Sequence, residues 1–218
     1  MLADGATVAF SAPATRRRPG PGTVRVARLQ PLPGAEAESR TIAAQLGTQA
    51  LTGRAATETT VRARMSRAPL IHFATHGLAY GSSNTARRSF VAFASDSTHD
   101  GLLTMGELLD DQSFSLIAEL VVLSACQSGL GDMKKAEGSV GLQRALLAKG
   151  ARSVLVSLWN VDDQATRLLM EKFYAYWLDP TTVRSKATAL QLAQEAVRQT
   201  PGYGNPKFWA AFQLVGAD

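Results

Sequence analysis

A histidine and the only cysteine of the chain each follow an apolar, strand-like run. His76 ends the passage LIHFATH, and Cys126 follows LVVLSA 50 residues later. A cysteine peptidase needs this pair, because the imidazole activates the thiol and then protonates the leaving amine. The backbone N–H groups of Gly77 and Cys126 could form the oxyanion hole for the tetrahedral intermediate. The two residues therefore predict acyl-transfer chemistry, provided that the fold brings them together.

Other interpretations of these residues are open at this stage. A lone cysteine is more often a small buried apolar side chain, so packing is the alternative for Cys126. Along an extended strand, His72 would lie about 13 Å from His76, too far to share a metal ion. We expect no metal site and expect His72 to be a buried sheet residue with its hydrogen bonds satisfied. The passage GLG at residues 129–131 lacks a nucleotide-binding pattern, so no cofactor is expected.

Composition indicates one α/β domain, since the 218 residues are 45% apolar and 19% charged. The net charge of +5 is concentrated near the start, where Arg16, Arg17 and Arg18 stand among Pro and Gly. We interpret residues 1–30 as a flexible basic segment or a loose edge strand, and residues 31–218 as the folded domain. A nucleic-acid partner is not expected. With no apolar run of about 18–20 residues and no signal-peptide pattern, the prediction is a cytoplasmic protein without a membrane span.

The order of elements predicts a mainly parallel sheet with helices on both faces. Helical spacing and capping residues predict helices over residues 36–47, 57–68, 138–149, 162–177 and 186–199. Short apolar runs predict strands at residues 70–74, 89–94, 120–125, 153–159 and 211–216. Ligands collect at the carboxyl ends of such strands, where His76 and Cys126 are expected.

Seven segments, in this order, resemble those of a CHAT domain, a module of the clan that includes caspases, metacaspases, gingipains and separase. They are LPGAEAESRTIAAQL, LTGRAATETTVRA, LIHFATHG, DGLLTMGEL, LVVLSACQSGLG, EGSVGLQRALLAKGARSVLVSLWNVDDQAT and FWAAFQLVGAD. The resemblance implies a caspase-like three-layer sandwich and a His76–Cys126 dyad. It also implies a cysteine endopeptidase that cleaves specific protein substrates, with bacterial defence or signalling as a setting. Such domains commonly follow TPR repeats, so a TPR-containing or other regulatory protein is an expected partner. The alternative is a non-catalytic CHAT scaffold that binds a protein partner.

The resemblance also places a substrate pocket between Ser124 and the loop that contains Trp159. Acid-cutting caspases present an arginine after the tryptophan, whereas this chain has Asn160. A preference for aspartate is therefore not expected, because its carboxylate would be buried without a charge partner. Asp162 and Asp163 could instead pair with an entering Arg or Lys. Alternatively both only cap the following helix, and the pocket is uncharged and takes Met or Leu.

Overall fold

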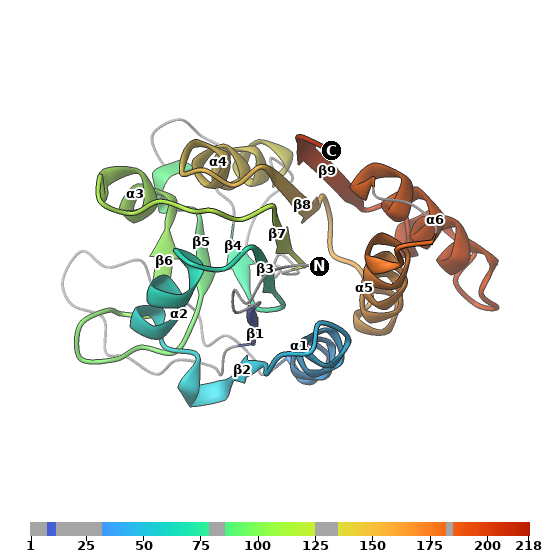
Figure 1. Ribbon diagram of the computed structural model, residues 1–218, viewed down its shortest axis with the longest axis horizontal. Coiled ribbons are helices and arrows are strands. Elements are labelled where there is room, and N and C mark those ends of the chain that lie inside the picture. The colour runs from blue at the N-terminus through green and yellow to red at the C-terminus, as the bar shows by residue number, and fades with distance from the viewer. Residues whose placement is uncertain (1–7, 12–31, 79–85, 125–134, 182–184) are drawn as a thin grey trace.

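The computed structural model describes residues 8–11, 32–78, 86–124, 135–181 and 185–218. Its main sheet has six strands in the order β2-β1-β3-β7-β8-β9. All pairings are parallel except that of β9 with β8 (Figure 1). The strands are β1 (Val8–Ser11), β2 (Leu51–Thr52), β3 (Leu70–Phe73), β7 (Leu120–Leu123), β8 (Ser153–Ser157) and β9 (Phe212–Gly216). The predicted mainly parallel α/β sheet is confirmed.

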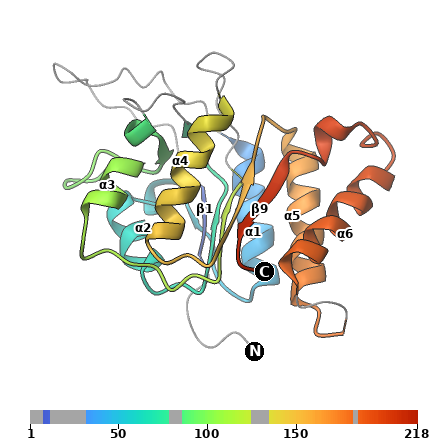
Figure 2. The ribbon, with the colours of Figure 1, turned by 90° about the horizontal axis from the view of Figure 1, so that it is seen from above.

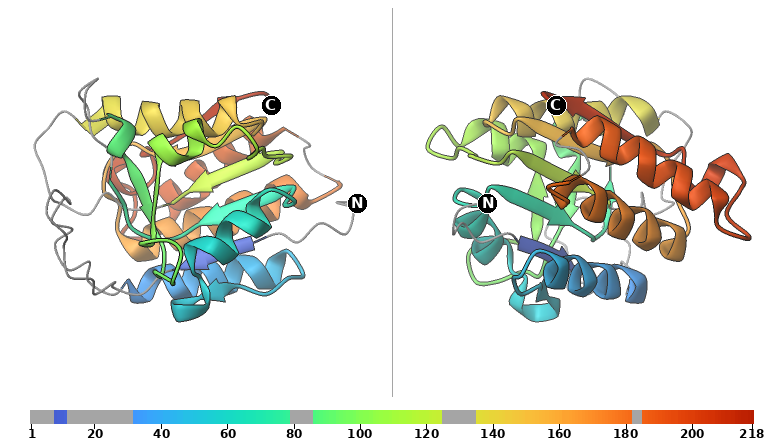
Figure 3. Two further views of the ribbon diagram at one scale, coloured as in Figure 1. Left: turned by 90° about the vertical axis from the view of Figure 1, so that its left-hand side faces the viewer. Right: turned by 45° about the vertical axis from the view of Figure 1, so that its right-hand side comes forward.

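Helices cover both faces of this sheet and complete the three layers (Figure 2). On one face lie α2 (Glu58–Met65), α3 (Met105–Asp110) and α4 (Lys135–Ala148). On the other lie α1 (Pro33–Gln45), α5 (Asp163–Leu178) and α6 (Lys186–Gln199), seen in the right-hand view of Figure 3. The five predicted helices are all present, and α6 has the predicted bounds.

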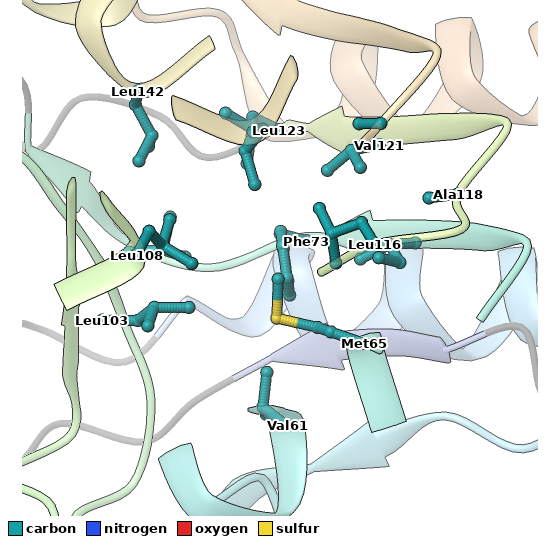
Figure 4. Packing of buried hydrophobic residues seen from close by; sticks show 14 of the residues in the cluster. Val61, Met65, Phe73, Leu103, Leu108, Leu116, Ala118, Val121, Leu123 and Leu142 are labelled. Atoms are coloured by element: carbon teal, nitrogen blue, oxygen red, sulfur yellow. The ribbon is translucent and has the colours of Figure 1, made fainter. Parts of the chain in front are cut away.

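Alternation along the central strands explains why helices are needed on both sides. In β3, Ile71 and Phe73 join the core under α2, α3 and α4. Figure 4 shows this core, with Met65 beside Phe73. Leu70 instead joins the core under α1, α5 and α6. Because successive side chains of a strand point to opposite faces, an apolar strand of this kind must be covered twice.

A second, smaller sheet contains β4 (Gly77–Leu78), β5 (Phe90–Ala92) and β6 (Leu102–Thr104). Its strands are antiparallel. The apolar run at residues 89–94, one of the strands predicted for the parallel sheet, lies here as β5. A short apolar run indicates that a strand is buried, but it does not indicate which strand is its neighbour. The sequence therefore could not assign this strand to one of the two sheets. The small sheet follows β3 directly in the chain and so borders the end of that strand.

The amino-terminal segment is described only at Val8–Ser11, which forms β1. This strand lies between β2 and β3 in the sheet, so it is not at an edge. The boundary placed after residue 30 and the basic run at residues 16–18 lie outside the described residues. Within the part of the chain that is described, no helix has the length and apolar character needed to cross a membrane.

Candidate active site

The neighbouring strands β3 and β7 end side by side and define the site (Figure 3, left). Phe73, the last residue of β3, is paired in register with Leu123, the last residue of β7. His76 follows its strand end by three residues, and Cys126 follows the other by the same number. Cys126 itself lies outside the described residues, so the structure describes only the histidine of the predicted dyad. In sequence, His76 and Cys126 therefore stand at the same offset from two strand ends that are paired in register.

The small antiparallel sheet holds the segment that carries His76. The backbone carbonyl of His76 accepts a hydrogen bond from Ala92 N at 2.8 Å, and Thr75 Oγ1 donates to Ala92 O at 2.8 Å. His76 is 5% exposed. Gly77, the predicted oxyanion-hole residue, begins β4 and is paired with Val91. The backbone of the segment that carries His76 is therefore held by the small antiparallel sheet.

Ser124 lies directly after β7, as predicted, and is 5% exposed. Its backbone N–H donates to Phe73 O at 3.0 Å, and its hydroxyl donates to the same carbonyl oxygen at 3.2 Å. Ser124 contributes to a small cavity of about 10 Å³ beside the strand ends. The cavity is lined by Leu32, Ala35, Glu38, Thr75, Ser124, Asp163 and Thr166.

The two predicted acidic residues before and in α5 have different positions. Asp162 is the N-cap: its Oδ1 accepts hydrogen bonds from Gln164 N and Ala165 N, both at 3.0 Å. Asp163 lines the small cavity with Ser124. Its carboxyl group packs so closely on α1 that a Cβ added at Gly34 would lie 2.5 Å from Asp163 Oδ2. Helix capping therefore accounts for Asp162, whereas Asp163 faces the site.

Partial burial is the main reason why the pKa of Asp163 is raised above its ordinary value of 3.8. The negative charges of Asp162 and Glu38 add to the increase, and electrostatic attraction by His76 opposes it. The carboxyl group of Asp163 is thus within electrostatic range of both Glu38 and His76. This places a negative charge beside the predicted catalytic histidine.

Trp159 and Asn160 lie on the loop after β8 but do not line the cavity with Ser124. The indole Nε1 of Trp159 donates to Lys207 O at 3.1 Å, and the residue is 39% exposed. Asn160 is exposed. Of the five predicted substrate-binding residues, the structure therefore brings only Ser124 and Asp163 together.

Sequence reasoning missed Glu38, which projects from α1 into the core and is 3% exposed. Its Oε1 lies 2.9 Å from His72 Nε2, and His72 Nδ1 lies 3.1 Å from the Tyr174 hydroxyl. Burial raises the pKa of Tyr174 well above 10, with a further contribution from the charge of Glu38. Because a carboxylate only accepts hydrogen bonds, the Nε2–H of His72 donates to Glu38, and Nδ1 of the neutral imidazole accepts from the Tyr174 hydroxyl. The prediction that His72 is a buried, satisfied sheet residue is confirmed.

A signal for Glu38 was present in the sequence. Glu38, Ile42 and Leu46 are spaced four apart and share one face of α1, and Ile42 is fully buried. A charged residue on the apolar face of a helix must find a partner or a function. Among the described residues, no group of three or more His, Cys, Asp and Glu side chains could hold a metal ion.

Solved structures with a similar fold include two cysteine-peptidase-clan proteins. The Arg-specific cysteine proteinase gingipain R matches with a TM-score of 0.58 at 10% identity, over 97% of this chain and 46% of that chain. Separase in the Saccharomyces cerevisiae separase–securin complex matches with a TM-score of 0.51 at 14% identity, over 97% of this chain and 12% of that chain. The fold is caspase-like, as predicted.

Sequence relatives and a family model agree with this fold. Tetratricopeptide repeat protein 28 of Mus musculus is 32% identical over 220 residues, and that of Homo sapiens is 32% identical over 219 residues. Both alignments cover 86% of this chain, which spans only 9% and 8% of the two relatives. The family model of the CHAT domain matches residues 3–217. With nearly every residue inside that match and a caspase-like fold around the site, the chain belongs to the CHAT domain family.

Proposed function

We propose that the protein is a cysteine endopeptidase that uses His76 and Cys126 as a catalytic dyad. The observation that carries this proposal is the register of β3 and β7, which pairs Phe73 with Leu123 three residues before each member of the dyad. Parallel strands that end in register present the following residues at one edge of the sheet, where α/β proteins gather their reactive groups. The caspase-like fold and the CHAT family membership support the same assignment.

In the proposed reaction, the Cys126 thiolate attacks the carbonyl carbon of the scissile peptide bond. The backbone N–H groups of Gly77 and Cys126 stabilise the oxyanion of the tetrahedral intermediate. His76 then donates a proton to the leaving amine, and an acyl-enzyme thioester remains. Water deprotonated by His76 attacks the thioester, which releases the acid product and restores the thiol. The carboxyl group of Asp163 lies within electrostatic range of His76.

The residue that precedes the scissile bond enters beside Ser124 and Asp163 in this proposal. The substrate also contacts the loop of Trp159, Asn160 and Asp162. Asn160 offers no positive charge, and Asp163 brings a negative one, so a substrate aspartate is rejected. A cytoplasmic setting fits this proposal, because the reducing cytosol keeps a catalytic thiol reduced. Bacterial defence or signalling remains a hypothesis, since the relatives named above are mouse and human proteins.

A regulatory partner with TPR repeats fits the proposal. The two relatives are named for tetratricopeptide repeats, and this chain corresponds to under a tenth of their length. Repeat arrays present extended concave surfaces for partner binding. We propose that a repeat-containing protein, or such repeats elsewhere in the same polypeptide, controls substrate access.

The test combines mutagenesis with active-site labelling. An irreversible thiol-directed peptide inhibitor should label the wild-type protein once, at Cys126, as read by mass spectrometry of digested protein. Cys126→Ala and His76→Ala should each abolish cleavage of a peptide library and leave the urea unfolding transition in place, because members of one catalytic unit fail together. Wild-type cleavage by Cys126→Ala would refute the assignment.

The second candidate is a CHAT scaffold that binds a protein without cleaving it. The names of the two sequence relatives favour this candidate, because they refer to tetratricopeptide repeats and do not mention an enzymatic activity. The same experiment separates the two functions. A scaffold leaves Cys126 unlabelled at inhibitor concentrations that saturate a peptidase, and it cleaves no peptide in the library.

A further inference from the structure

The polar side chains that line the small cavity beside the strand ends are all carboxylates or hydroxyls, and Leu32 and Ala35 complete its lining. Its polar lining comes from α1, from the ends of β3 and β7, and from the first turn of α5. The polar residues are Glu38, Thr75, Ser124, Asp163 and Thr166. The chemistry of these groups, together with the cavity size, defines what can bind.

Two hydroxyl groups of the cavity already donate hydrogen bonds to backbone carbonyl oxygens. Thr75 Oγ1 donates to Ala92 O at 2.8 Å, and Ser124 Oγ donates to Phe73 O at 3.2 Å. Each oxygen can then only accept a hydrogen bond from a bound group. Thr166 is 2% exposed, and among the described residues its hydroxyl has no hydrogen-bond partner. A buried hydroxyl without a partner indicates a position that a ligand or water completes.

The two carboxylates give the cavity its charge. Glu38 is held in place by the chain of hydrogen bonds through His72 to Tyr174. Glu38 and Asp163 repel each other, and within the described part of the chain neither pairs with a lysine or arginine. Arg167, one turn further along α5, pairs with Glu171 at 3.2 Å. A bound cation would relieve the repulsion between the two carboxylates.

The size of the cavity selects among cations. Its volume of about 10 Å³ corresponds to one water-sized group. A lysine ammonium is compact and carries three donors and no acceptor, which matches an acceptor-lined site. A guanidinium is a planar fork with five N–H donors and needs a wider space. An uncharged side chain of the same length would leave the repulsion between the two carboxylates in place and the Thr166 hydroxyl without a hydrogen-bond partner.

We propose that this cavity binds the ammonium group of a lysine side chain, with Glu38 as a specificity-determining residue alongside Asp163. The inference rests on the proposed peptidase function for the role of that lysine, which would occupy the position before the scissile bond. Thr75 immediately precedes His76 in the chain, and Asp163, which also lines the cavity, is within electrostatic range of His76. A lysine bound there would bring its own carbonyl group toward His76.

The binding test avoids catalysis by using the Cys126→Ala protein. The immobilised protein is exposed to three random-sequence peptide pools, each fixed at one position as Lys, Arg or norleucine. We expect the Lys pool to be retained at least tenfold better than the other two. Retention of the norleucine pool equal to that of the Lys pool, or better retention of the Arg pool, would overturn the inference.

Variants in the same background assign the effect to the carboxylates. Glu38→Gln and Asp163→Asn should each lower retention of the Lys pool about tenfold, and Glu36→Gln should not change it. Glu36 lies on the same helix but is exposed and pairs with Arg40 at 2.7 Å. Glu38→Gln could impair folding, because Glu38 belongs to the buried chain of hydrogen bonds with His72 and Tyr174. Asp163 is not part of that chain, so Asp163→Asn tests the site without this complication. Unchanged retention in Asp163→Asn would contradict the proposed site.

Cleavage by the wild-type protein separates this inference from the proposed function. Cleavage after lysine by the wild-type protein, together with Lys-pool retention, supports both. Retention without any cleavage would remove the peptidase function and leave the lysine site. Cleavage without a lysine preference would leave the peptidase and remove the site.

Discussion

Glu58 should make the stability of the protein depend on pH near neutrality. It is the first residue of α2 and is fully buried. Its Oε2 accepts a hydrogen bond from Gly101 N at 3.2 Å, and its Oε1 lies 3.9 Å from Arg62 Nη1. Burial raises the pKa of Glu58 from 4.5 to about 7, helped by the charges of Glu107 and Asp100 and opposed by Arg62 and Gly101.

The magnitude follows from the difference between the two pKa values. A raised pKa means that the folded protein favours the protonated carboxyl group more than the unfolded chain does. The associated stability is fully present below pH 4.5 and is lost as the pH rises through about 7. At about 1.4 kcal/mol per pKa unit, the loss amounts to about 3 kcal/mol over the whole titration. Most of it falls between about pH 5 and pH 8.

The assay is urea unfolding of the wild-type protein and Glu58→Gln at about pH 5 and pH 8. Glutamine resembles the protonated carboxyl group and keeps an acceptor for Gly101 N–H. The free energy of unfolding should therefore fall with pH by about 2–3 kcal/mol more in the wild-type protein than in Glu58→Gln. Glu36→Gln, an exposed carboxylate on α1, is the matched control and should follow the wild type. An equal pH dependence for wild type and Glu58→Gln would refute the reasoning.

Two further predictions concern close packing and a buried charge. Gly34→Ala should weaken the lysine preference in peptide-library cleavage, because its Cβ would lie 2.5 Å from Asp163 Oδ2, whereas Gly204→Ala, whose Cβ would have only an ordinary contact at 3.6 Å, should not. An unchanged preference in Gly34→Ala would show that Asp163 can move without consequence. Lys186→Met should lower the free energy of urea unfolding by about 2–3 kcal/mol, since Lys186 is 1% exposed and pairs with the Glu119 carboxylate. Arg198→Met, which breaks an exposed pair with Glu195, should lower the free energy of unfolding much less, and equal losses would contradict this account.

Local patterns predicted most of the elements. The apolar spacing of residues 186–199 predicted the bounds of α6, and Asp162 before an apolar periodic run marked the start of α5. The apolar runs of β3, β7 and β8 indicated strands buried on both faces. Such signals are local because helix caps, helical periodicity and strand alternation involve residues within a few positions of one another.

The sequence did not predict which strands pair with one another. The run that forms β5 has the same apolar character as the strands of the main sheet, yet it pairs with β4 and β6. Val8–Ser11 was expected at most as a loose edge strand, and it lies between β2 and β3. The choice of a neighbouring strand depends on long-range contacts that burial alone does not specify.

For the candidate site, the sequence already contained the reactive groups: a histidine and a single thiol, each following a predicted strand by the same number of residues. Tertiary structure decided which polar side chains share the cavity. Glu38 reaches it because His72, 34 residues away, and Tyr174, 102 residues beyond His72, satisfy a buried chain of hydrogen bonds. A buried carboxylate is stable only with such partners, and their distance along the chain hides them from any local pattern.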